Sequence, residues 1–595
     1  MTTVGAGCST PADHAESATL HAFLNCYLRE TDDGAVVPAD ETPVDAEGDV
    51  IRVPLERQGT TVYAPLRYES ATGRHLFDLP VYGRSGDGPV AELDAGTLAA
   101  LARRELALWS DDTLASAGTD LLRRVLTSRS VIERFVANHE DTEERHDIGT
   151  TFREAEQALL YGHQLHPTPK SRDGIPSHQV PTYAPELGSS FRLRYFAADP
   201  DIVSDWSARE GTAAEWVAES LDGECPPAAE TALDQGRVVV PAHPWQADYL
   251  RSQNHVRTEI ERGTVTDLGR FGPTFYPTTS VRTLWSPDAP FMVKGSLAVK
   301  ITNAERTNKR PELARGVAVS ELLDTGFGDR LDEEFPRFNI VEDPAALTLD
   351  VGDGPESGFE TVLRENPFRG ADAENVTPVV TLCQDGVDGP SRLGRLVRDI
   401  AARADRPEQE VAREWFREYL AVTLRPVLWS YFELGVGVEA HQQNTLLRLD
   451  DEAWPAEGYY RDNQGYYFPE SRYEQVDEWL PGVGERADTV CSDDIADERL
   501  RYYTVCNNAF GVVNALGVAD LIDESALLTD LRSELQALQE FEPPESTLVS
   551  ALLTEKRIPC KGNLLTRFEG LDELENSLEN QSVYVDIENP VVTKT

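Results

Sequence analysis

Lysine is the residue that this 595-residue chain most clearly lacks. Only seven lysines occur, so arginine supplies most of the 55 basic side chains, against 103 acidic ones and a formal net charge of −48. A field of that sign repels phosphate backbones and anionic lipids, which argues against binding to nucleic acids or membrane surfaces. Because concentrated salt screens carboxylate repulsion beyond about 3 Å, we interpret the excess as halophilic adaptation to a salty cytoplasm. The alternative is an acidic face for basic partners, but the acids are spread along the whole chain.

The chain also lacks several common signatures. Its seven cysteines include no Cys-x-x-Cys pair, which argues against zinc, iron–sulfur and disulfide frameworks. No window approaches 18 uninterrupted apolar residues, and no basic start precedes an apolar run, so we expect a soluble cytoplasmic protein. The P-loop, Rossmann and nucleophile-elbow motifs are absent, which excludes those three interpretations.

The periodicity of apolar residues predicts an α+β chain. Residues 11–30 and 95–138 have helical spacing, whereas residues 50–83 alternate as short strands. Mixed loops and strands follow, and a Gly/Asp/Pro-rich segment at 350–360 is either a boundary or a surface excursion. Long helical patterns come after it. We therefore predict three parts: 1–145, 146–360 and 361–595.

The strongest polar cluster follows a predicted apolar-faced helix at 413–434 that ends at Gly435. The order of loop, strand and Arg-Asp resembles a kinase catalytic loop, in which amide and carboxylate oxygens hold magnesium while His and Gln donate to phosphates. A capped helix followed by a solvated loop is the alternative interpretation. The residues that carry the pattern are Glu439, His441, Gln443, Asn444 and Asp462.

A second cluster contains retained lysines. Lys294 and Lys300 lie in an apolar strand pattern, and a lysine kept where arginine is the rule suggests a point contact to phosphate. Two edge-strand lysines that reach solvent are the alternative. An anion cradle precedes the strand and consists of Ser280, Arg282 and Thr283. Two polar residues, Asn303 and Arg306, follow the strand.

A third cluster is an island of positive charge at 161–174, a Pro-broken loop suited to a small polycarboxylate. It contains His163, His166, Lys170 and Arg172. Metal binding by the two histidines is a competing interpretation, but no third ligand stands at a typical spacing. Lys561 and Arg567 form a late basic pair.

These segments in order resemble the aerobactin-synthetase (IucA/IucC) family of siderophore synthetases that act without a nonribosomal peptide synthetase. The resemblance covers roughly residues 150 to 570, and no motif is recognised in the first 145. The segments are GHQLHPTPKSR, HPWQ, SVRT, KGSLAVKITNAER, EAHQQN, RD and CKGNLLTRF.

The resemblance implies a cytoplasmic, usually dimeric enzyme with three domains (thumb, fingers and palm) that form a cradle. Such an enzyme uses ATP and magnesium to adenylate a carboxylate of citrate or a related acid. An amine or hydroxyl of a polyamine-type, often N-hydroxylated, building block then captures the adenylate. The C-terminal part also resembles ferric reductases, but these need a cysteine cluster that the chain lacks, so we expect no redox activity.

The resemblance also implies roles for individual residues. Catalysis falls to Arg282, Lys294, Arg306 and His441. The nucleotide site adds Ser280, Thr283, Asn303, Gln443 and Asn444. The acid would meet His166, Lys170, Arg172 and Lys561. The magnesium candidates are Glu439, Asn444 and Asp462. A kinase-like phosphotransferase and a non-catalytic siderophore-binding protein are the rival functions.

Overall fold

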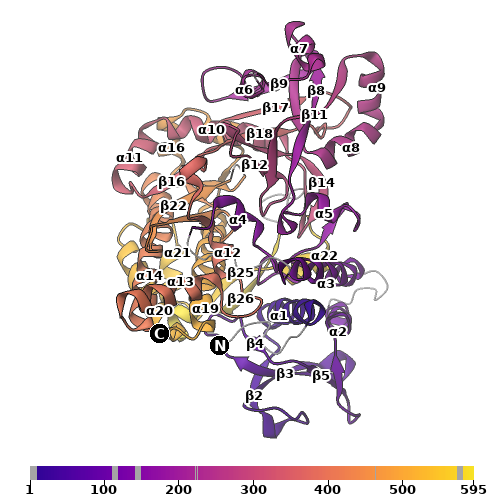
Figure 1. Ribbon diagram of the computed structural model, residues 1–595. Coiled ribbons are helices and arrows are strands. Elements are labelled where there is room, and N and C mark those ends of the chain that lie inside the picture. Colours follow the sequence, from indigo (N-terminus) through magenta and orange to yellow (C-terminus); the bar gives the residue numbers. More distant parts are fainter. Residues whose placement is uncertain are drawn as a thin grey trace.

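The computed structural model describes residues 10–109, 118–140, 149–221, 223, 225–462, 464–572 and 581–594. Helices and sheets both contribute, as the α+β prediction requires. Figure 1 shows a small sheet at one end of the molecule, a large sheet at the other, and a helical region beside the space between them. None of the described helices is long and apolar enough to cross a membrane.

The N-terminal sheet is antiparallel, with the order β1-β2-β3-β5-β6 and β4 paired to β3. Its strands are β1 (Ala35–Pro38), β2 (Asp49–Leu55), β3 (Thr60–Tyr68), β4 (Leu76–Phe77), β5 (Val81–Ser85) and β6 (Ala91–Leu93). The helices of this part are α1 (Pro11–Thr31), α2 (Ala95–Trp109) and α3 (Thr119–Glu140). The predicted helix at 11–30, the predicted strands at 50–83 and the helical prediction at 95–109 and 119–138 are thus confirmed, whereas residues 110–117 lie outside the described residues. The predicted boundary at 145 lies outside the described residues.

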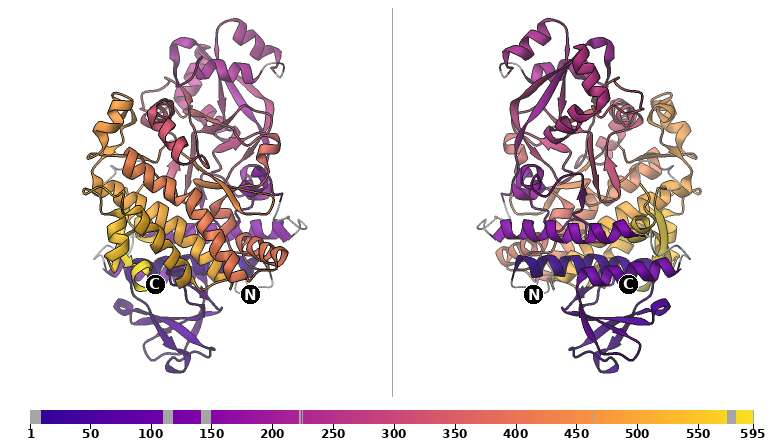
Figure 2. Two further views of the ribbon diagram at one scale, coloured as in Figure 1. Left: turned by 90° about the vertical axis from the view of Figure 1, so that its left-hand side faces the viewer. Right: turned by 90° about the vertical axis from the view of Figure 1, so that its right-hand side faces the viewer.

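The large sheet has eight strands in the order β10-β8-β11-β12-β13-β18-β17-β9, and every neighbouring pair is antiparallel. The strands are β8 (Phe191–Ala198), β9 (Val203–Ser207), β10 (Val238–Ala242), β11 (Val265–Pro277), β12 (Thr283–Trp285), β13 (Phe291–Gly295), β17 (Ala345–Leu349) and β18 (Thr361–Glu365). Short helices lie near it at the same end of the molecule (Figures 1 and 2): α6 (Ala213–Ser220), α7 (Pro227–Asp234), α8 (Pro244–Ser252) and α9 (Asn254–Arg262).

Two details of this region differ from the sequence pattern. The apolar run that contains Lys294 and Lys300 forms two strands in two sheets, because β13 ends at Gly295 and β14 (Leu297–Ile301) joins β7 (Arg172–Asp173) and β15 (Ala304–Arg306). The segment 350–360 is a loop between β17 and β18, which pair with each other. It therefore matches a surface excursion, and a boundary at 360 would cut β18 from its own sheet.

The C-terminal region is largely helical, as predicted, and contains the largest apolar core. The predicted helix at 413–434 is interrupted: α14 (Glu408–Val422), α15 (Leu424–Trp429) and the π-helix η6 (Ser430–Leu434) follow one another. Pro426 explains the break, because a proline has no N–H for the carbonyl four residues earlier. The run ends at Gly435, whose φ of 72° favours glycine, as expected.

The other helices and strands after residue 309 pack in this core or next to it. The helices are α10 (Arg310–Leu323), α11 (Gly326–Glu334), α12 (Val379–Cys383), α13 (Arg392–Ala404), α16 (Tyr473–Trp479), α17 (Val483–Ala487), α18 (Asp493–Leu500), η7 (Arg501–Ala509), α19 (Phe510–Val518), α20 (Glu524–Leu538), α21 (Leu548–Thr554), α22 (Asn563–Glu569) and α23 (Pro590–Thr593). The strands are β16 (Phe338–Val341), β19 (Val376–Pro378), β20 (Gly437–Val438), β21 (Thr445–Leu449), β22 (Pro455–Arg461), β23 (Tyr466–Pro469), β24 (Val490–Cys491), β25 (Arg557–Gly562) and β26 (Val583–Glu588).

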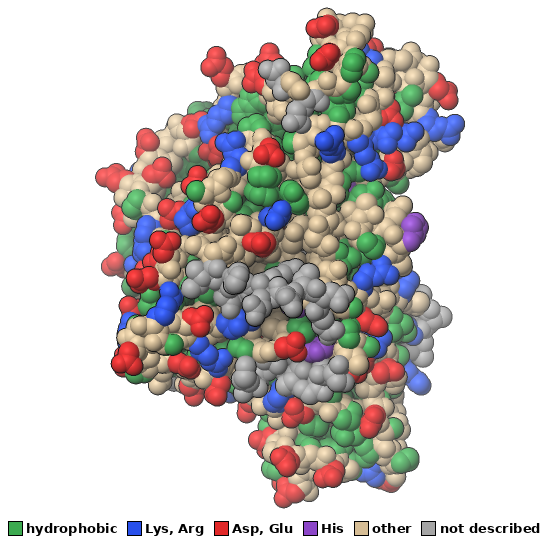
Figure 3. All heavy atoms as spheres, viewed as in Figure 1, with side chains coloured by type: hydrophobic (Ala, Val, Ile, Leu, Met, Phe, Trp, Pro, Cys, Tyr) green, Lys and Arg blue, Asp and Glu red, His purple; other side chains and the backbone are tan. Residues whose placement is uncertain are grey.

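Acidic side chains are distributed over the visible surface rather than gathered on one face (Figure 3). They occur over the small sheet, the large sheet and the helical region alike. This distribution agrees with the spread of acids along the sequence, and it does not mark a single docking face for a basic partner.

Candidate functional site

A cavity of about 840 Å³ opens where the large sheet, the loop after β20 and the end of β25 come together. All three clusters predicted from the sequence line this cavity. The predicted site residues found in its wall are His166, Lys170, Arg172, Ser280, Arg282, Thr283, Lys294, Asn303, Arg306, Glu439, His441, Gln443, Asn444, Asp462 and Lys561. Lys300 instead pairs with Asp572 at 3.0 Å, and Arg567 pairs with Asp120.

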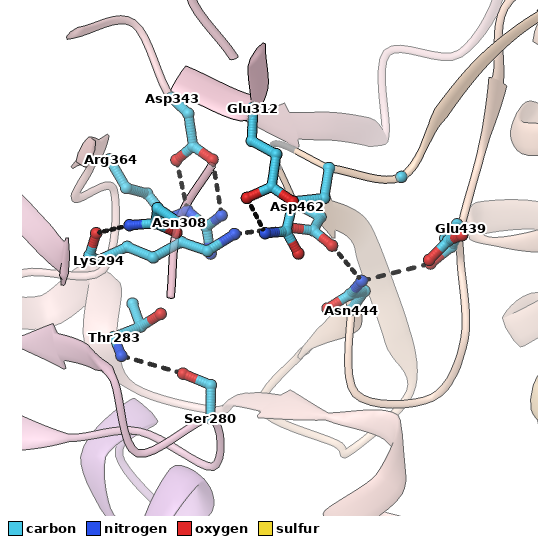
Figure 4. Close-up of polar contacts among 12 residues, drawn as sticks. Ser280, Thr283, Lys294, Asn308, Glu312, Asp343, Arg364, Glu439, Asn444 and Asp462 are labelled. Carbon is cyan, nitrogen blue, oxygen red and sulfur yellow. Dashed lines mark hydrogen bonds and ion pairs between the residues drawn. The ribbon is translucent and has the colours of Figure 1, made fainter. Parts of the chain in front are cut away.

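The turn between β11 and β12 forms one edge of the cavity. The Ser280 hydroxyl accepts a hydrogen bond from the Thr283 backbone N–H at 3.0 Å (Figure 4), and Thr278 donates its N–H to the Thr283 carbonyl at 2.9 Å. Val281 has a φ of 67°, a conformation that β-branched residues rarely adopt. The surrounding bonds therefore hold a strained turn, as is common in ligand-binding loops.

Arg282 is buried, and its guanidinium contacts neutral oxygens. It donates to the Arg306 carbonyl at 3.2 Å, to Asn308 Oδ1 at 2.8 Å and to Gln464 Oε1 at 3.4 Å. Burial, with a contribution from nearby Arg306, lowers the pKa of Arg282 to about 10, so the side chain remains a cation at neutral pH.

Lys294 and Asp462 form a buried ion pair at the centre of the site. The ammonium lies 2.7 Å from Asp462 Oδ1, and only 4% of Lys294 is exposed. Burial lowers the pKa of Lys294 to about 8, although Asp462 opposes the shift. Burial alone would raise the pKa of Asp462, but Lys294 and Arg364 bring it below its ordinary range. Asp462 is therefore ionised at neutral pH.

A second carboxylate stands near Asp462. The Asn444 amide donates to Asp462 Oδ2 at 3.2 Å and to the Glu439 backbone carbonyl at 3.4 Å (Figure 4). The Glu439 carboxylate accepts a hydrogen bond from the Tyr467 hydroxyl, and burial raises its pKa. No cluster of three His, Cys, Asp or Glu ligands occurs in the described part of the chain. Two carboxylates fit Mg²⁺, which usually takes its other ligands from water and substrate phosphates.

His441 presents a hydrogen-bond donor rather than a base to the cavity. Its Nδ1 accepts the backbone N–H groups of Gln443 and Asn444, at 3.1 and 3.3 Å. Burial lowers the pKa of His441 to about 3, so the ring is neutral at pH 7. Because Nδ1 accepts, the single ring proton must be on Nε2.

His166 is held in the same tautomer. Its Nδ1 accepts the Thr168 N–H at 3.1 Å, so Nε2–H donates to Asn303 Oδ1 at 3.1 Å. Arg306, at the end of β15, donates to the Ile301 carbonyl at 3.1 Å and to the Thr302 hydroxyl at 2.8 Å. These bonds fix two polar side chains of the cavity wall in defined orientations.

The remaining basic residues form two further groups. Lys170 and Arg172 both pair with Glu186, at 2.6 and 2.5 Å, so two cations share one buried carboxylate. Lys561 lies over the ring of Tyr503 at 5.7 Å and near that of Tyr502 at 6.0 Å. The predicted island of positive charge thus retains a net charge of about +1 at Glu186.

Several residues of the site were not found from the sequence: Gln464 and Tyr503 line the cavity, and Asn308 is buried behind its wall. Asn308 holds Arg282 through Oδ1 and donates its amide to the Lys294 carbonyl at 3.0 Å. Gln464 contacts Arg282 and donates to Glu312 at 2.7 Å. Asn308 follows Arg306 by two positions and could have been suspected, whereas Tyr503, whose ring faces the Lys561 ammonium, has no sequence signal.

Comparison with known proteins gives two family matches. A family model described as IucA / IucC family matches residues 151–384. A second, described as ferric iron reductase FhuF-like transporter, matches residues 413–576. Together they cover nearly the same stretch as the recognised motifs.

Full-length relatives extend this similarity to most of the first 145 residues. A spermidine-citrate ligase of Bacillus anthracis is 39% identical over 594 residues, covering 97% of this chain and 98% of its own. The rhizobactin siderophore biosynthesis protein RhbC of Rhizobium meliloti is 35% identical and covers 98% of each chain. The structure of ATP-bound aerobactin synthetase IucA from Klebsiella pneumoniae has a TM-score of 0.87 at 26% identity, covering 97% of this chain and 99% of that chain.

Proposed function

The chain belongs to the IucA / IucC family and is a carbon–nitrogen ligase, and from that premise we propose its reaction. It adenylates one carboxylate of citrate, or of a citryl or succinyl derivative, with ATP and Mg²⁺. It then joins the activated acyl group to an amine or hydroxyl of a building block and releases AMP and pyrophosphate. The names of the relatives, a spermidine-citrate ligase and siderophore synthetases, support this assignment.

The observation that carries the proposal is the convergence of three cations on one cavity in a molecule of net charge −48. Arg282, Lys294 and Arg306 come from separate strands or turns, yet all three line the same wall. Ligands of high negative charge are the species that such a wall binds best, because fixed cations in a low-dielectric pocket act strongly. A triphosphate together with citrate matches this charge.

The chemistry needs activation because a carboxylate is a poor electrophile. A citrate oxygen attacks the α-phosphorus of ATP, the bond to the β-phosphate oxygen breaks, and pyrophosphate leaves. Arg282, Lys294 and the Nε2–H of His441 would offset the charge that gathers on the phosphoryl oxygens. The neutral amine then attacks the acyl carbon, AMP leaves, and the proton lost by the amine passes to a base that we do not assign. A closed cavity would protect the adenylate from water.

Magnesium would be held by Asp462 and Glu439, with Asn444 beside them. When bound, the ion supplies charge neutralisation at the phosphates. Asp462 fits this role because it is ionised at neutral pH, and the Asn444 amide fixes its orientation. Ser280, Thr283, Asn303 and Gln443 would complete the nucleotide site.

The acid would bind at the other basic groups of the wall. His166 donates from Nε2, Lys561 is a cation over two aromatic rings, and Lys170 with Arg172 leaves a net positive charge beside Glu186. The amine is proposed to be of the polyamine type, as in the ligase of Bacillus anthracis, or its N-hydroxylated form. We further propose a cytoplasmic homodimer from a halophile, with thumb, fingers and palm domains forming the cradle.

The test is a pyrophosphate-release screen of candidate acids and amines in molar KCl. We expect release that depends on citrate or a close derivative, with AMP as the nucleotide product. ADP without AMP would instead identify a kinase-like phosphotransferase. Siderophore binding that is independent of ATP, without turnover of any acid, would identify a binding protein. Either result would overturn the proposal.

A further inference from the structure

Glu156 is a buried carboxylate behind the cavity that contacts two separate parts of its wall. It lies on α4 (Phe152–Gln157), is 2% exposed, and is not among the described side chains that line the cavity. Its Oε2 accepts the backbone N–H of Thr279 at 2.8 Å. Its Oε1 lies 2.5 Å from Nη1 of Arg461. One side chain therefore joins the turn before β12 to the end of β22.

Each contact of Glu156 adjoins a residue of the nucleotide site. Thr279 immediately precedes Ser280, which accepts the Thr283 N–H within the strained turn. Arg461 immediately precedes Asp462, and its Nη2 donates to the Gln443 carbonyl at 3.1 Å. The position of one carboxylate is thus coupled to the backbone on both sides of the space proposed for the triphosphate.

The helix that carries Glu156 is itself fixed. Thr151 and Glu154 form a capping box at its start, which satisfies N–H groups that would otherwise lack partners. Phe152 is fully buried, with its ring 4.8 Å from that of Phe368 and 5.7 Å from that of Trp285. A carboxylate on so well packed a support can hold its two partners at a constant separation.

We propose that Glu156 is a positioning residue that sets the distance between the turn at 278–283 and the Arg461–Asp462 end of β22. The inference rests on the proposed function, because it assumes that both parts bind one triphosphate. Misplacement of binding groups by about 1 Å costs on the order of 100-fold in rate. Gln443 also links the two parts, through its amide and the Thr279 hydroxyl at 3.1 Å. It lines the cavity, however, so substituting it would change ligand contacts as well.

The experiment compares Glu156→Gln and Glu156→Asp with the unmodified enzyme. Glu156→Gln keeps an acceptor for Thr279 but removes the charge that faces Arg461, so we expect the Kd and KM for ATP to rise about tenfold or more. Glu156→Asp keeps the charge on a shorter side chain, and we expect a rise of about threefold. The readouts are calorimetric ATP affinity, citrate-dependent exchange of pyrophosphate into ATP, and Tm.

The matched control is Asp385→Asn, which breaks another buried ion pair, that of Asp385 with Arg74. Neither partner is among the described residues lining the cavity, so the control should lower Tm and leave ATP affinity within about twofold. The inference is wrong if Glu156→Gln behaves like this control. Should Glu156→Gln fail to fold, an unchanged ATP affinity in Glu156→Asp would overturn it equally. Absence of citrate-dependent exchange in the unmodified enzyme would defeat the proposed function alone, because ATP affinity tests the inference separately.

Discussion

Lys294 and Lys170 occupy two regions of the cavity with nearly identical local physics. Each is 4% exposed, each has a pKa lowered to about 8 by burial, and each lies within 2.7 Å of a carboxylate. The difference is in the partner. Asp462 lines the cavity, whereas Glu186 is a fully buried residue shared with Arg172. The comparison teaches that burial and a shifted pKa do not distinguish the region proposed for the nucleotide from the region proposed for the acid; what differs is whether the counter-ion faces the cavity.

The largest expected contrast is in catalysis. Lys294→Ala and Arg306→Ala should each reduce citrate-dependent pyrophosphate release about 100-fold or more while the fold survives, because each removes a cation from the charge that gathers in the transition state. Lys170→Ala should mainly raise the KM for citrate, with kcat reduced less than about tenfold. Steady-state kinetics with circular dichroism measures both effects. If Lys294→Ala and Arg306→Ala released pyrophosphate as fast as the unmodified enzyme, the distinction between the two regions of the cavity would be wrong.

The pH dependence should separate the two lysines next. Since the pKa of Lys294 is lowered to about 8, its charge is lost above that pH, and kcat/KM for ATP should fall about tenfold per pH unit. Pyrophosphate exchange without amine avoids the titration of the second substrate. Lys294→Arg should shift the fall to higher pH, and Lys170→Met should keep it near 8. If the pH at which kcat/KM for ATP falls shifted only in Lys170→Met, the roles assigned to the two regions would be reversed.

The same shift predicts the opposite trend for stability. The folded pKa of about 8 lies below the ordinary value of 10.5, so between these pH values the unfolded chain binds more protons than the folded one. The two lysines should therefore add to the free energy of unfolding as pH rises from 8 to 10.5, although activity falls. Urea denaturation of the unmodified enzyme and of Lys170→Met across this range measures the contribution of Lys170.

The smallest contrast should be in the free energy of unfolding that is lost when Lys294 or Lys170 is replaced at neutral pH. Breaking a buried ion pair usually costs about 3–5 kcal/mol because one charge is left uncompensated. Glu186 retains Arg172 in Lys170→Met, so we expect a smaller loss, about 1–3 kcal/mol. The double variant Lys170→Met/Arg172→Met should lose distinctly more than the sum of the losses in the two single variants, because only the double variant leaves Glu186 without a cation among its described partners. Additive losses in urea denaturation would show that Glu186 does not couple the two cations.

The polar segments recognised in the sequence contain side chains that line one cavity, although their roles stay predictions. The scarcity of lysine drew attention to Lys294, which lines that cavity. It drew attention to Lys300 equally, yet Lys300 lies on a different sheet and pairs with Asp572. The alternation of apolar residues could not separate Lys294 from Lys300, because the strand breaks at Gly295 where the chain passes from one sheet to another.

Contacts between distant segments were beyond the reach of the sequence. Glu156 stands in a segment without a motif, and its partners Thr279 and Arg461 lie 123 and about 300 positions away along the chain. Glu186 also lacks a motif, although its partner Lys170 is only 16 positions away. The interrupted helix before Gly435 is an intermediate case, since Pro426 signals the break but not the π-helical turn that follows. Periodicity reports which face of an element is buried, not which buried groups meet.

Arg282 is a cation whose hydrogen bonds go to uncharged oxygens alone among the described contacts, from Arg306, Asn308 and Gln464. Burial and nearby Arg306 lower the pKa of Arg282 although the carboxylates of Glu312 and Asp462 oppose the shift, so an anionic ligand would stabilise the charged form further. Saturating ATP should accordingly protect the fold against heat, by about 2.7 kcal/mol at a hundredfold excess over Kd. Arg282→Gln should start from an equal or higher melting temperature and lose that protection, the signature of a residue that sacrifices resting stability for its substrate.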